Sequence, residues 1–315
     1  MKNRRIILGI DTSNYTTSAA LLYEDGELIA NIKRPLAVAA GERGLRQSDA
    51  VFSHVKNFPS LMGEVSDALN GRTPSAIGVS EKPRNIDGSY MPCFLTGVAV
   101  AESIAASVGA PLYKFSHQCG HIMAAMYSSG SESLMQGQFA AFHVSGGTTE
   151  LLLVNKDERG FKTNLVGGTK DLNAGQVIDR IGVFLGMPFP AGPHMEKCAL
   201  EYKGKIPSKK VSVDRTYSNL SGLENMAKKI NDESADKSKT AAFVFEYIGN
   251  SIKQMCMNLI DEYGQMPFVF AGGVMCNSII KDKLSKSFDA YFADPSMSAD
   301  NAVGIAELTR LNFVK

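Results

Sequence analysis

The stretch that decides the fold is Phe139-Ala140-Ala141-Phe142-His143-Val144-Ser145-Gly146-Gly147-Thr148-Thr149-Glu150-Leu151-Leu152-Leu153-Val154-Asn155. Two short apolar runs flank a polar turn with paired glycines, and this pattern predicts two strands joined by a tight connection. A hairpin at residues 157–160 leads into a third apolar run at residues 161–166. We therefore predict a triplet of strands in the middle of the chain.

The same triplet occurs near the N-terminus. Its three apolar segments are at residues 6–10, 18–23 and 27–33. A polar turn at residues 11–17 joins the first two, and a hairpin at residues 24–26 joins the last two. Alignment of Thr16-Thr17 with Thr148-Thr149 sets Asp11 opposite His143. This internal duplication is the strongest architectural signal in the chain.

Each triplet is followed by helices that alternate with short apolar strands. After the first we predict helices at 48–69 and 94–108, a strand at 76–80 and a helical segment at 117–126. After the second we predict helices at 174–185, 222–230 and 240–263, a strand at 268–271, a helix from Asn277 and a last helix that begins at 298–302. Alternating strands and helices favour parallel or mixed sheets covered on both faces.

The repeat predicts an α/β protein of two similar lobes. We expect a first lobe at residues 1–133, a second at 134–300, and a final helix at 301–315 that packs back on the first. Two such lobes with a cleft between them resemble the actin, sugar-kinase and Hsp70 (ASKHA) superfamily. A single dinucleotide-binding domain explains the repeat less well, and the chain has no Gly-x-Gly-x-x-Gly.

Composition limits the class of protein. The chain has 315 residues, a net charge of +1 and no apolar run long enough to span a bilayer. The apolar start ends at Asp11, which is too early for a secretory signal. Five irregularly spaced cysteines are typical of free thiols in a reducing compartment, so we expect a cytoplasmic protein. The balanced charge leaves only local patches for nucleic-acid contact.

His117 and His121 are four residues apart, a spacing that places both imidazoles on one face of a helix. A divalent metal needs this arrangement from two nitrogen ligands, although two ligands alone do not hold a catalytic ion. Asp300, near the last helix, is either a helix cap or the carboxylate that completes the site.

Glycine turns mark a second candidate site. The paired glycines of Ser145-Gly146-Gly147-Thr148 allow close approach to an anion. Gly272-Gly273, followed by Asn277, suits a ribose or adenine held at a helix start. Asp171, Gly175 and Asp179 form a third element, in which Asp171 is either a ligand contact or a helix N-cap. Residues 190–193 are expected in a loop that lines the cleft.

Taken in order, these pieces resemble the TsaD family, also called YgjD or Gcp, over nearly the whole chain. Its members transfer a threonylcarbamoyl group to adenosine beside the anticodon of tRNA. The resemblance depends on the segments 8–13, 117–121, 144–149, 171–179, 221–223, 272–277 and 300–302.

The resemblance implies roles for individual residues. His117, His121 and Asp300 would hold one Fe²⁺ or Zn²⁺ ion, and His143 would be a fourth ligand where some relatives have tyrosine. The adenylate's ribose and base would contact Asp171, Gly175, Asp179, Gly192 and Asn277, with Thr148, Gly272 and Gly273 beside them. Ser145, Gly146 and Gly147 would face its phosphate or the carbamoyl group.

The chain departs from the family at several positions. Relatives usually have Asp-Asp-Ala-x-Gly-Glu, where this chain has Leu172 and Gln176 in place of two acidic residues. Thr148 replaces a histidine or asparagine, and residues 81–88 replace a Gly-Pro-Gly loop. These changes keep the expected metal ligands and alter the pocket, as in a diverged paralogue with another acceptor or acyl group.

We therefore expect a metal-dependent acyltransferase that moves a carbamoyl group from a carbamoyl-adenylate to an amine, with Asp11 as a candidate general base. An ATP-dependent phosphotransferase or ATPase of the same superfamily is the first alternative, and a non-catalytic paralogue of an active homologue is the second. The sequence disfavours a zinc protease, because Gln118, not glutamate, follows the first histidine. The partners implied are an adenine nucleotide, tRNA, and TsaB- or TsaE-type proteins or a second copy. Five basic residues offer a tRNA contact or a solvated surface: Lys203, Lys205, Lys209, Lys210 and Arg215.

Overall fold

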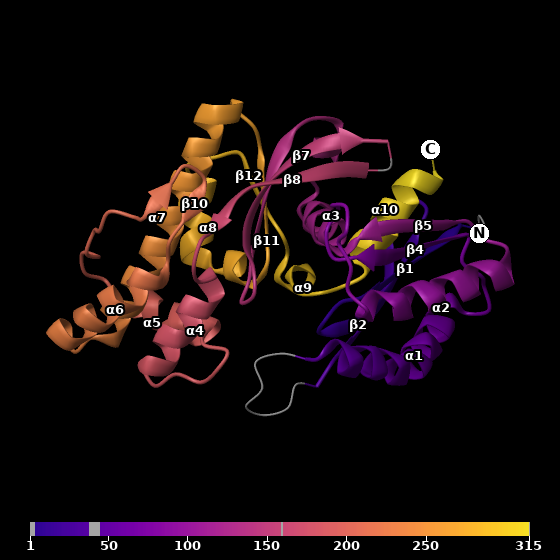
Figure 1. Ribbon diagram of the computed structural model, residues 1–315, viewed down its shortest axis with the longest axis horizontal. Helices are drawn as coiled ribbons and strands as arrows, with labels where there is room; N and C mark the ends of the chain where they lie inside the picture. The colour runs from indigo at the N-terminus through magenta and orange to yellow at the C-terminus, as the bar shows by residue number, and fades with distance from the viewer. Residues whose placement is uncertain (1–3, 38–44, 159, 315) are drawn as a thin grey trace. The chain divides into compact units, whose positions relative to one another are not determined.

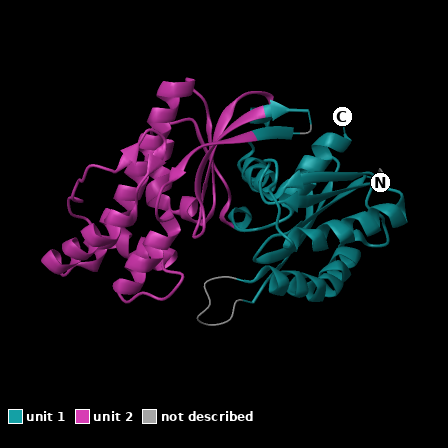
Figure 2. Ribbon diagram, viewed as in Figure 1, with its two compact units in different colours: residues 1–135, 156–162, 296–315 teal, residues 136–155, 163–295 magenta. Residues whose placement is uncertain are grey.

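The computed structural model describes residues 4–37, 45–158 and 160–314. The chain packs into two compact units (Figure 2). The first comprises residues 1–135, 156–162 and 296–315, and the second comprises residues 136–155 and 163–295. This division groups residues 296–300 with the first unit, whereas the sequence analysis assigned them to the second lobe.

A five-stranded mixed sheet, in the order β3-β2-β1-β4-β5, forms the centre of the first unit. Its strands are β1 (Ile6–Thr12), β2 (Thr16–Tyr23), β3 (Leu28–Pro35), β4 (Ala76–Lys82) and β5 (Leu112–Ser116). The β1–β2 and β2–β3 pairs are antiparallel, and β1, β4 and β5 run parallel. β5 was missed by sequence reasoning because its five residues form no continuous apolar run and are too few to establish an alternating pattern.

Helices cover both faces of this sheet (Figure 1). On one face, α1 (Gln47–Leu69) and α2 (Cys93–Val108) pack on the even-numbered apolar residues of β1, such as Leu8. On the other, α10 (Val303–Phe313) contributes Val303 and Ala306 to a core with Ile7. α3 (His117–Ser129) lies against α10 and β4.

The second unit repeats this design. Its sheet has the order β12-β11-β6-β7-β8-β10-β9, in which β8-β7-β6-β11-β12 corresponds to β3-β2-β1-β4-β5. The strands are β6 (Phe139–Val144), β7 (Thr149–Asp157), β8 (Gly160–Thr169), β9 (Val213–Asp214), β10 (Tyr217–Ser218), β11 (Phe268–Ala271) and β12 (Ala290–Phe292). Asp11 pairs with Ser18, and His143 pairs with Glu150, each one step before the end of its ladder. The two sheets confirm the duplication and the α/β fold.

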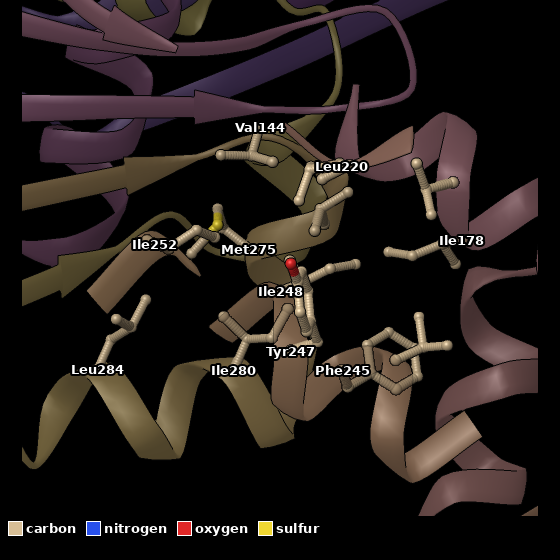
Figure 3. Close-up of a cluster of buried hydrophobic side chains, with 14 of the residues drawn as sticks. Val144, Ile178, Leu220, Phe245, Tyr247, Ile248, Ile252, Met275, Ile280 and Leu284 are labelled. Carbon is tan, nitrogen blue, oxygen red and sulfur yellow. The ribbon is translucent and has the colours of Figure 1, made fainter. Parts of the chain in front are cut away.

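The core of the second unit lies between its sheet and the helices that follow it (Figure 3). The long helix α7 (Lys237–Tyr263) supplies Phe245, Ile248 and Ile252 to the same core as Val144 of β6. The other elements are α4 (Ala174–Phe184), α5 (Gly192–Glu201), α6 (Ser221–Ser234), the 3-10 turn Gly273–Cys276 and α8 (Ser278–Ser285). Buried side chains of this core hold the glycine turns on a rigid base.

Two local details near the candidate site residues differ from expectation. Gly192 is not in a loop but begins α5, with Pro193 in the first turn, where a missing N–H is tolerated. Asp300 lies in the turn between α9 (Pro295–Ser298) and α10, so it precedes the last helix rather than beginning it. Among the described residues, no helix combines the length and apolar character that a membrane crossing requires.

Candidate metal centre and nucleotide pocket

Three potential metal ligands meet in the first unit. His117 and His121 lie at the start of α3, whose N-cap Ser116 accepts a hydrogen bond from the backbone N–H of Cys119. His121 Nε2 lies 3.0 Å from His117 Nε2 and 3.1 Å from Asp300 Oδ1. One ligand atom from each of the three residues lies within 4.8 Å of the others.

Close helix packing brings Asp300 to the histidines. A Cβ at Gly304 of α10 would lie 1.9 Å from the carbonyl oxygen of Gly120 in α3, so only glycine permits this approach. Asn301 Oδ1 accepts from the N–H of Val303 and thereby ties the turn to the helix start. Asp300 is therefore held at the histidine pair by the packing of α10 on α3.

Asp11 orients His117. His117 Nδ1 lies 2.8 Å from Asp11 Oδ1, which leaves Nε2 for the ligand position. Asp11 is fully buried, and its Oδ2 has no hydrogen-bond partner among the described residues. The geometry fits a carboxylate that supports a metal-binding histidine, and the general-base role of Asp11 stays a prediction.

The charges of the cluster shift its pKa values. Burial lowers the pKa of His117, but the charge and hydrogen bond of Asp11 and the charge of Asp300 outweigh it and raise that pKa to about 9. Burial raises the pKa of Asp300, yet the hydrogen bond from His121 and the nearby imidazoles hold it well below its usual value. Ser13 adds a further hydrogen bond to the Asp300 carboxylate.

The residues present fit one divalent transition metal. Two imidazole nitrogens and a carboxylate oxygen face one another, and this donor set suits Fe²⁺ or Zn²⁺. The partner of His117 is a buried carboxylate, as is usual for histidine ligands. His143 belongs to the second unit, on β6 beside Ala271, and its role as fourth ligand stays a prediction.

A pocket of about 290 Å³ lies in the second unit, where most of the predicted nucleotide contacts line it. These lining residues are Gly146, Gly175, Asp179, Gly192, Gly273 and Asn277. Asn277 is 5% exposed; its Oδ1 caps α8 through the N–H of Ile280, and its Nδ2 has no partner among the described residues. A buried amide donor without a partner, in a pocket wall, is a feature that a ligand acceptor would satisfy.

Gly175 sets the glycine turn against α4. The N–H of Gly175 donates to Ser145 O at 3.3 Å, and a Cβ here would lie 2.7 Å from three backbone atoms of Ser145 and Gly146. The turn itself closes through Ser145 N to Thr148 O at 2.8 Å. Gly146 and Gly147 are exposed, and the N–H of Gly147 donates to Ser145 Oγ at 3.3 Å.

Asp171 has a structural role that differs from both predictions made for it, a ligand contact and the N-cap of the helix that follows it. Its carboxylate accepts hydrogen bonds from the N–H groups of Leu172, Leu220 and Ser221 and from the Ser221 hydroxyl. It thus holds the start of α6, not the start of α4. Asp171 does not line the pocket, and its predicted contact with the ribose stays a prediction.

The departures from the family pattern have local explanations. Gln176 Oε1 accepts from the N–H of Asn173, so it serves in the cap of α4. Leu172 packs against the core of the second unit. Pro83, in the altered segment 81–88, accepts a hydrogen bond from the N–H of Gln118 at the start of α3.

Sequence reasoning missed several pocket residues. Phe245 and Val274 supply apolar walls, and Glu196 accepts from the N–H and hydroxyl of Ser278 at the start of α8. Glu196 and Phe245 lie inside helices without a motif, so only the tertiary structure identifies them. Asp179, also in the pocket, accepts from the N–H of Ala191 and links α4 to the start of α5.

Comparison with known sequences gives a consistent answer. The profile of the TsaD family, described as tRNA N6-adenosine threonylcarbamoyltransferase, matches residues 29–307. A curated protein of that name from Bacillus thuringiensis is 28% identical over 325 aligned positions, with 97% of this chain and 91% of the relative covered.

Solved structures show the same fold at low identity. Component A of the (R)-2-hydroxyglutaryl-CoA dehydratase of Acidaminococcus fermentans has a TM-score of 0.57 at 16% identity, with 99% of this chain and 100% of that chain covered. A ROK family glucokinase of Streptomyces griseus has a TM-score of 0.53 at 14% identity, with 97% and 99% covered. These similarities show that the chain shares the fold of these two proteins.

Proposed function

Because this chain belongs to the TsaD family of tRNA N6-adenosine threonylcarbamoyltransferases, we propose that it transfers a threonylcarbamoyl group from a carbamoyl-adenylate to an amine. The acceptor we propose is adenosine of tRNA next to the anticodon. The observation that carries the proposal is the convergence of His117, His121 and Asp300 in a chain whose family membership covers residues 29–307.

The proposal assigns the metal to the first unit. His117 and His121 would bind it through Nε2, and Asp300 through Oδ1. When bound, such an ion polarises a carbonyl group and orients an oxygen ligand of the substrate. Asp11 keeps the His117 ring in the orientation that ligation requires, because its Oδ1 holds the Nδ1 side of the ring.

The adenylate is assigned to the pocket of the second unit. Asn277 Nδ2 would donate to the base or ribose, and the apolar wall at Phe245 and Val274 would exclude water from one side of the ligand. The N–H groups of Gly146 and Gly147 would face phosphate oxygens and developing negative charge. AMP is then the leaving group when the acceptor amine attacks the carbamoyl carbon.

The acceptor and protein partners remain proposals of the same kind. The basic residues after α5, such as Lys203 and Lys209, are exposed and available for tRNA. TsaB- or TsaE-type proteins, or a second copy, are the protein partners that we expect from the family.

The decisive experiment measures consumption of threonylcarbamoyl-adenylate and formation of the modified nucleoside, with and without tRNA. We expect tRNA-dependent consumption that is lost on chelation, restored by Fe²⁺ or Zn²⁺, and lost in His121→Ala. Activity that survives complete metal removal contradicts the metal-dependent mechanism.

The same assay distinguishes threonylcarbamoyl transfer from the two alternative functions. Turnover of ATP with Mg²⁺ alone, without consumption of the adenylate, supports a phosphotransferase or ATPase. Binding of nucleotide with neither activity, together with stimulation of an active homologue, supports a non-catalytic paralogue.

A further inference from the structure

We propose that His54 is a positioning residue for the metal centre, which holds the backbone at Ser13 so that Ser13 fixes the Asp300 carboxylate. This inference rests on the metal site of the proposed function. It concerns a residue on α1 that belongs to neither the ligand set nor the pocket.

The contact between Ser13 and Asp300 is direct. Ser13 Oγ donates to Asp300 Oδ2 at 2.5 Å, and the other oxygen, Oδ1, lies 3.1 Å from His121 Nε2. Ser13 is 3% exposed, so water has little access to compete for this bond. Ser13 therefore determines which carboxylate oxygen faces the histidines.

His54 holds the main chain of Ser13. Its side chain is fully buried, with Nε2 2.8 Å from Ser13 O and Nδ1 2.8 Å from Thr17 Oγ1. The imidazole thus bridges both ends of the turn between β1 and β2. Besides this bond, the main chain of Ser13 bonds within the turn through its N–H to Thr16 O at 3.2 Å.

The hydrogen-bond network specifies the protonation of His54. A carbonyl oxygen only accepts, so Nε2 carries the ring proton and donates to Ser13 O. Nδ1 of the neutral ring then accepts from the Thr17 hydroxyl, whose oxygen also accepts from Asn57 Nδ2. Burial lowers the pKa of His54, and this shift favours the same neutral form.

These bonds form a chain from α1 to the ligand: His54 to Ser13, and Ser13 to Asp300. Loss of the His54 donor would leave the buried Ser13 carbonyl without its ring partner and loosen the turn that carries the Ser13 hydroxyl. Groups that hydrogen-bond a metal ligand, as Ser13 does here, typically change metal affinity by about 10- to 100-fold when they are removed, and His54 would act through Ser13.

Two substitutions of similar polarity test the inference. In His54→Gln the terminal amide reaches the place of Nε2 and keeps a donor for Ser13. In His54→Asn the shorter amide reaches only the place of Nδ1, so the bond to Thr17 is kept and the bond to Ser13 is lost. The apo proteins are titrated with Co²⁺, and affinity is read from the visible absorption of the bound ion and by competition with a chelator.

We expect His54→Asn to weaken Co²⁺ binding by about 10- to 100-fold, and His54→Gln to stay within a few-fold of the wild type. Both variants lose thermal stability, so stability alone does not produce this contrast. In a Ser13→Ala background His54→Asn should have no further effect on affinity, since the link to Asp300 is already absent.

Equal Co²⁺ affinity in His54→Asn and the wild type overturns the inference, as does a full additional loss in the Ser13→Ala background. If His54→Asn does not fold, Ser13→Ala replaces it, because it removes the hydroxyl through which His54 would act on Asp300. Weaker Co²⁺ binding in Ser13→Ala is expected, and unchanged binding is contrary evidence. Two other outcomes would refute the metal site of the proposed function rather than the role of His54. One is a wild-type protein that binds no Co²⁺, and the other is equal Co²⁺ affinity in His121→Ala and the wild type.

Discussion

Replacement of Gly175 by alanine tests whether the pocket depends on contact between the glycine turn and α4. In an ordinary helix this change stabilises, because alanine has the higher helix propensity by about 1 kcal/mol. Here the added Cβ would lie 2.7 Å from Ser145 O and from two backbone atoms of Gly146. None of these three atoms belongs to a flexible side chain, so the turn itself must move.

The size of the effect follows from that distance. An ordinary contact needs about 3.5 Å or more between such atoms, so the turn must withdraw by nearly an ångström. Overpacking of this kind costs about 1–3 kcal/mol, which exceeds the propensity gain and reverses the sign of the change. A displacement on the order of 1 Å also moves the N–H of Gly146, which we propose faces the phosphate. Loss of one hydrogen bond to a charged group costs about 1.5–3 kcal/mol, which lowers ligand affinity roughly tenfold or more.

The assay measures the free energy of unfolding in urea and the affinity for ATP by calorimetry. Two matched variants serve as controls. Gly222→Ala, near the start of α6 with no atom within 4 Å of the new Cβ, should lose neither stability nor ATP affinity. Gly192→Ala, equally unhindered but in the pocket wall, should keep stability and weaken binding. A Gly175→Ala protein with wild-type stability and wild-type ATP affinity would refute the reasoning.

Three other predictions follow from the site. Asp11→Asn should weaken Zn²⁺ binding by about 10- to 100-fold, because the orienting charge on His117 is lost; unchanged affinity in a chelator competition would contradict this. Asn277→Leu should lower ATP affinity if its free Nδ2 meets the ligand, and calorimetry that finds equal affinity would argue against that contact. Burial raises the pKa of Asp171, but hydrogen bonds from Ser221, Leu220 and Leu172 outweigh it and lower that pKa to about 2. Since the folded value lies below the unfolded value, the stability from Asp171 is complete above about pH 4 and is lost as pH falls towards 2. Urea unfolding of Asp171→Asn should therefore show a smaller loss of stability than the wild type across that interval.

The repeated strand triplet could be predicted because its information is local. The apolar runs and turns at residues 6–33 and 139–166 can be recognised without the rest of the chain, and each sheet contains its predicted triplet as three neighbouring strands. Capping residues were harder to assign, because a carboxylate such as Asp171 binds a helix start about fifty residues away. Sequence distance gives no indication of that contact.

The amino-acid sequence by itself determined the two α/β repeats, the histidine pair on one helix face and the glycine turns, since these depend on spacing over a few residues. Only the tertiary structure decided that Asp300 meets His121, that Asp11 supports His117, and that Glu196 and Phe245 line the pocket. Such contacts join residues up to 179 positions apart. They arise from helix packing on a shared sheet, which depends on the shape of the whole unit rather than on any short motif.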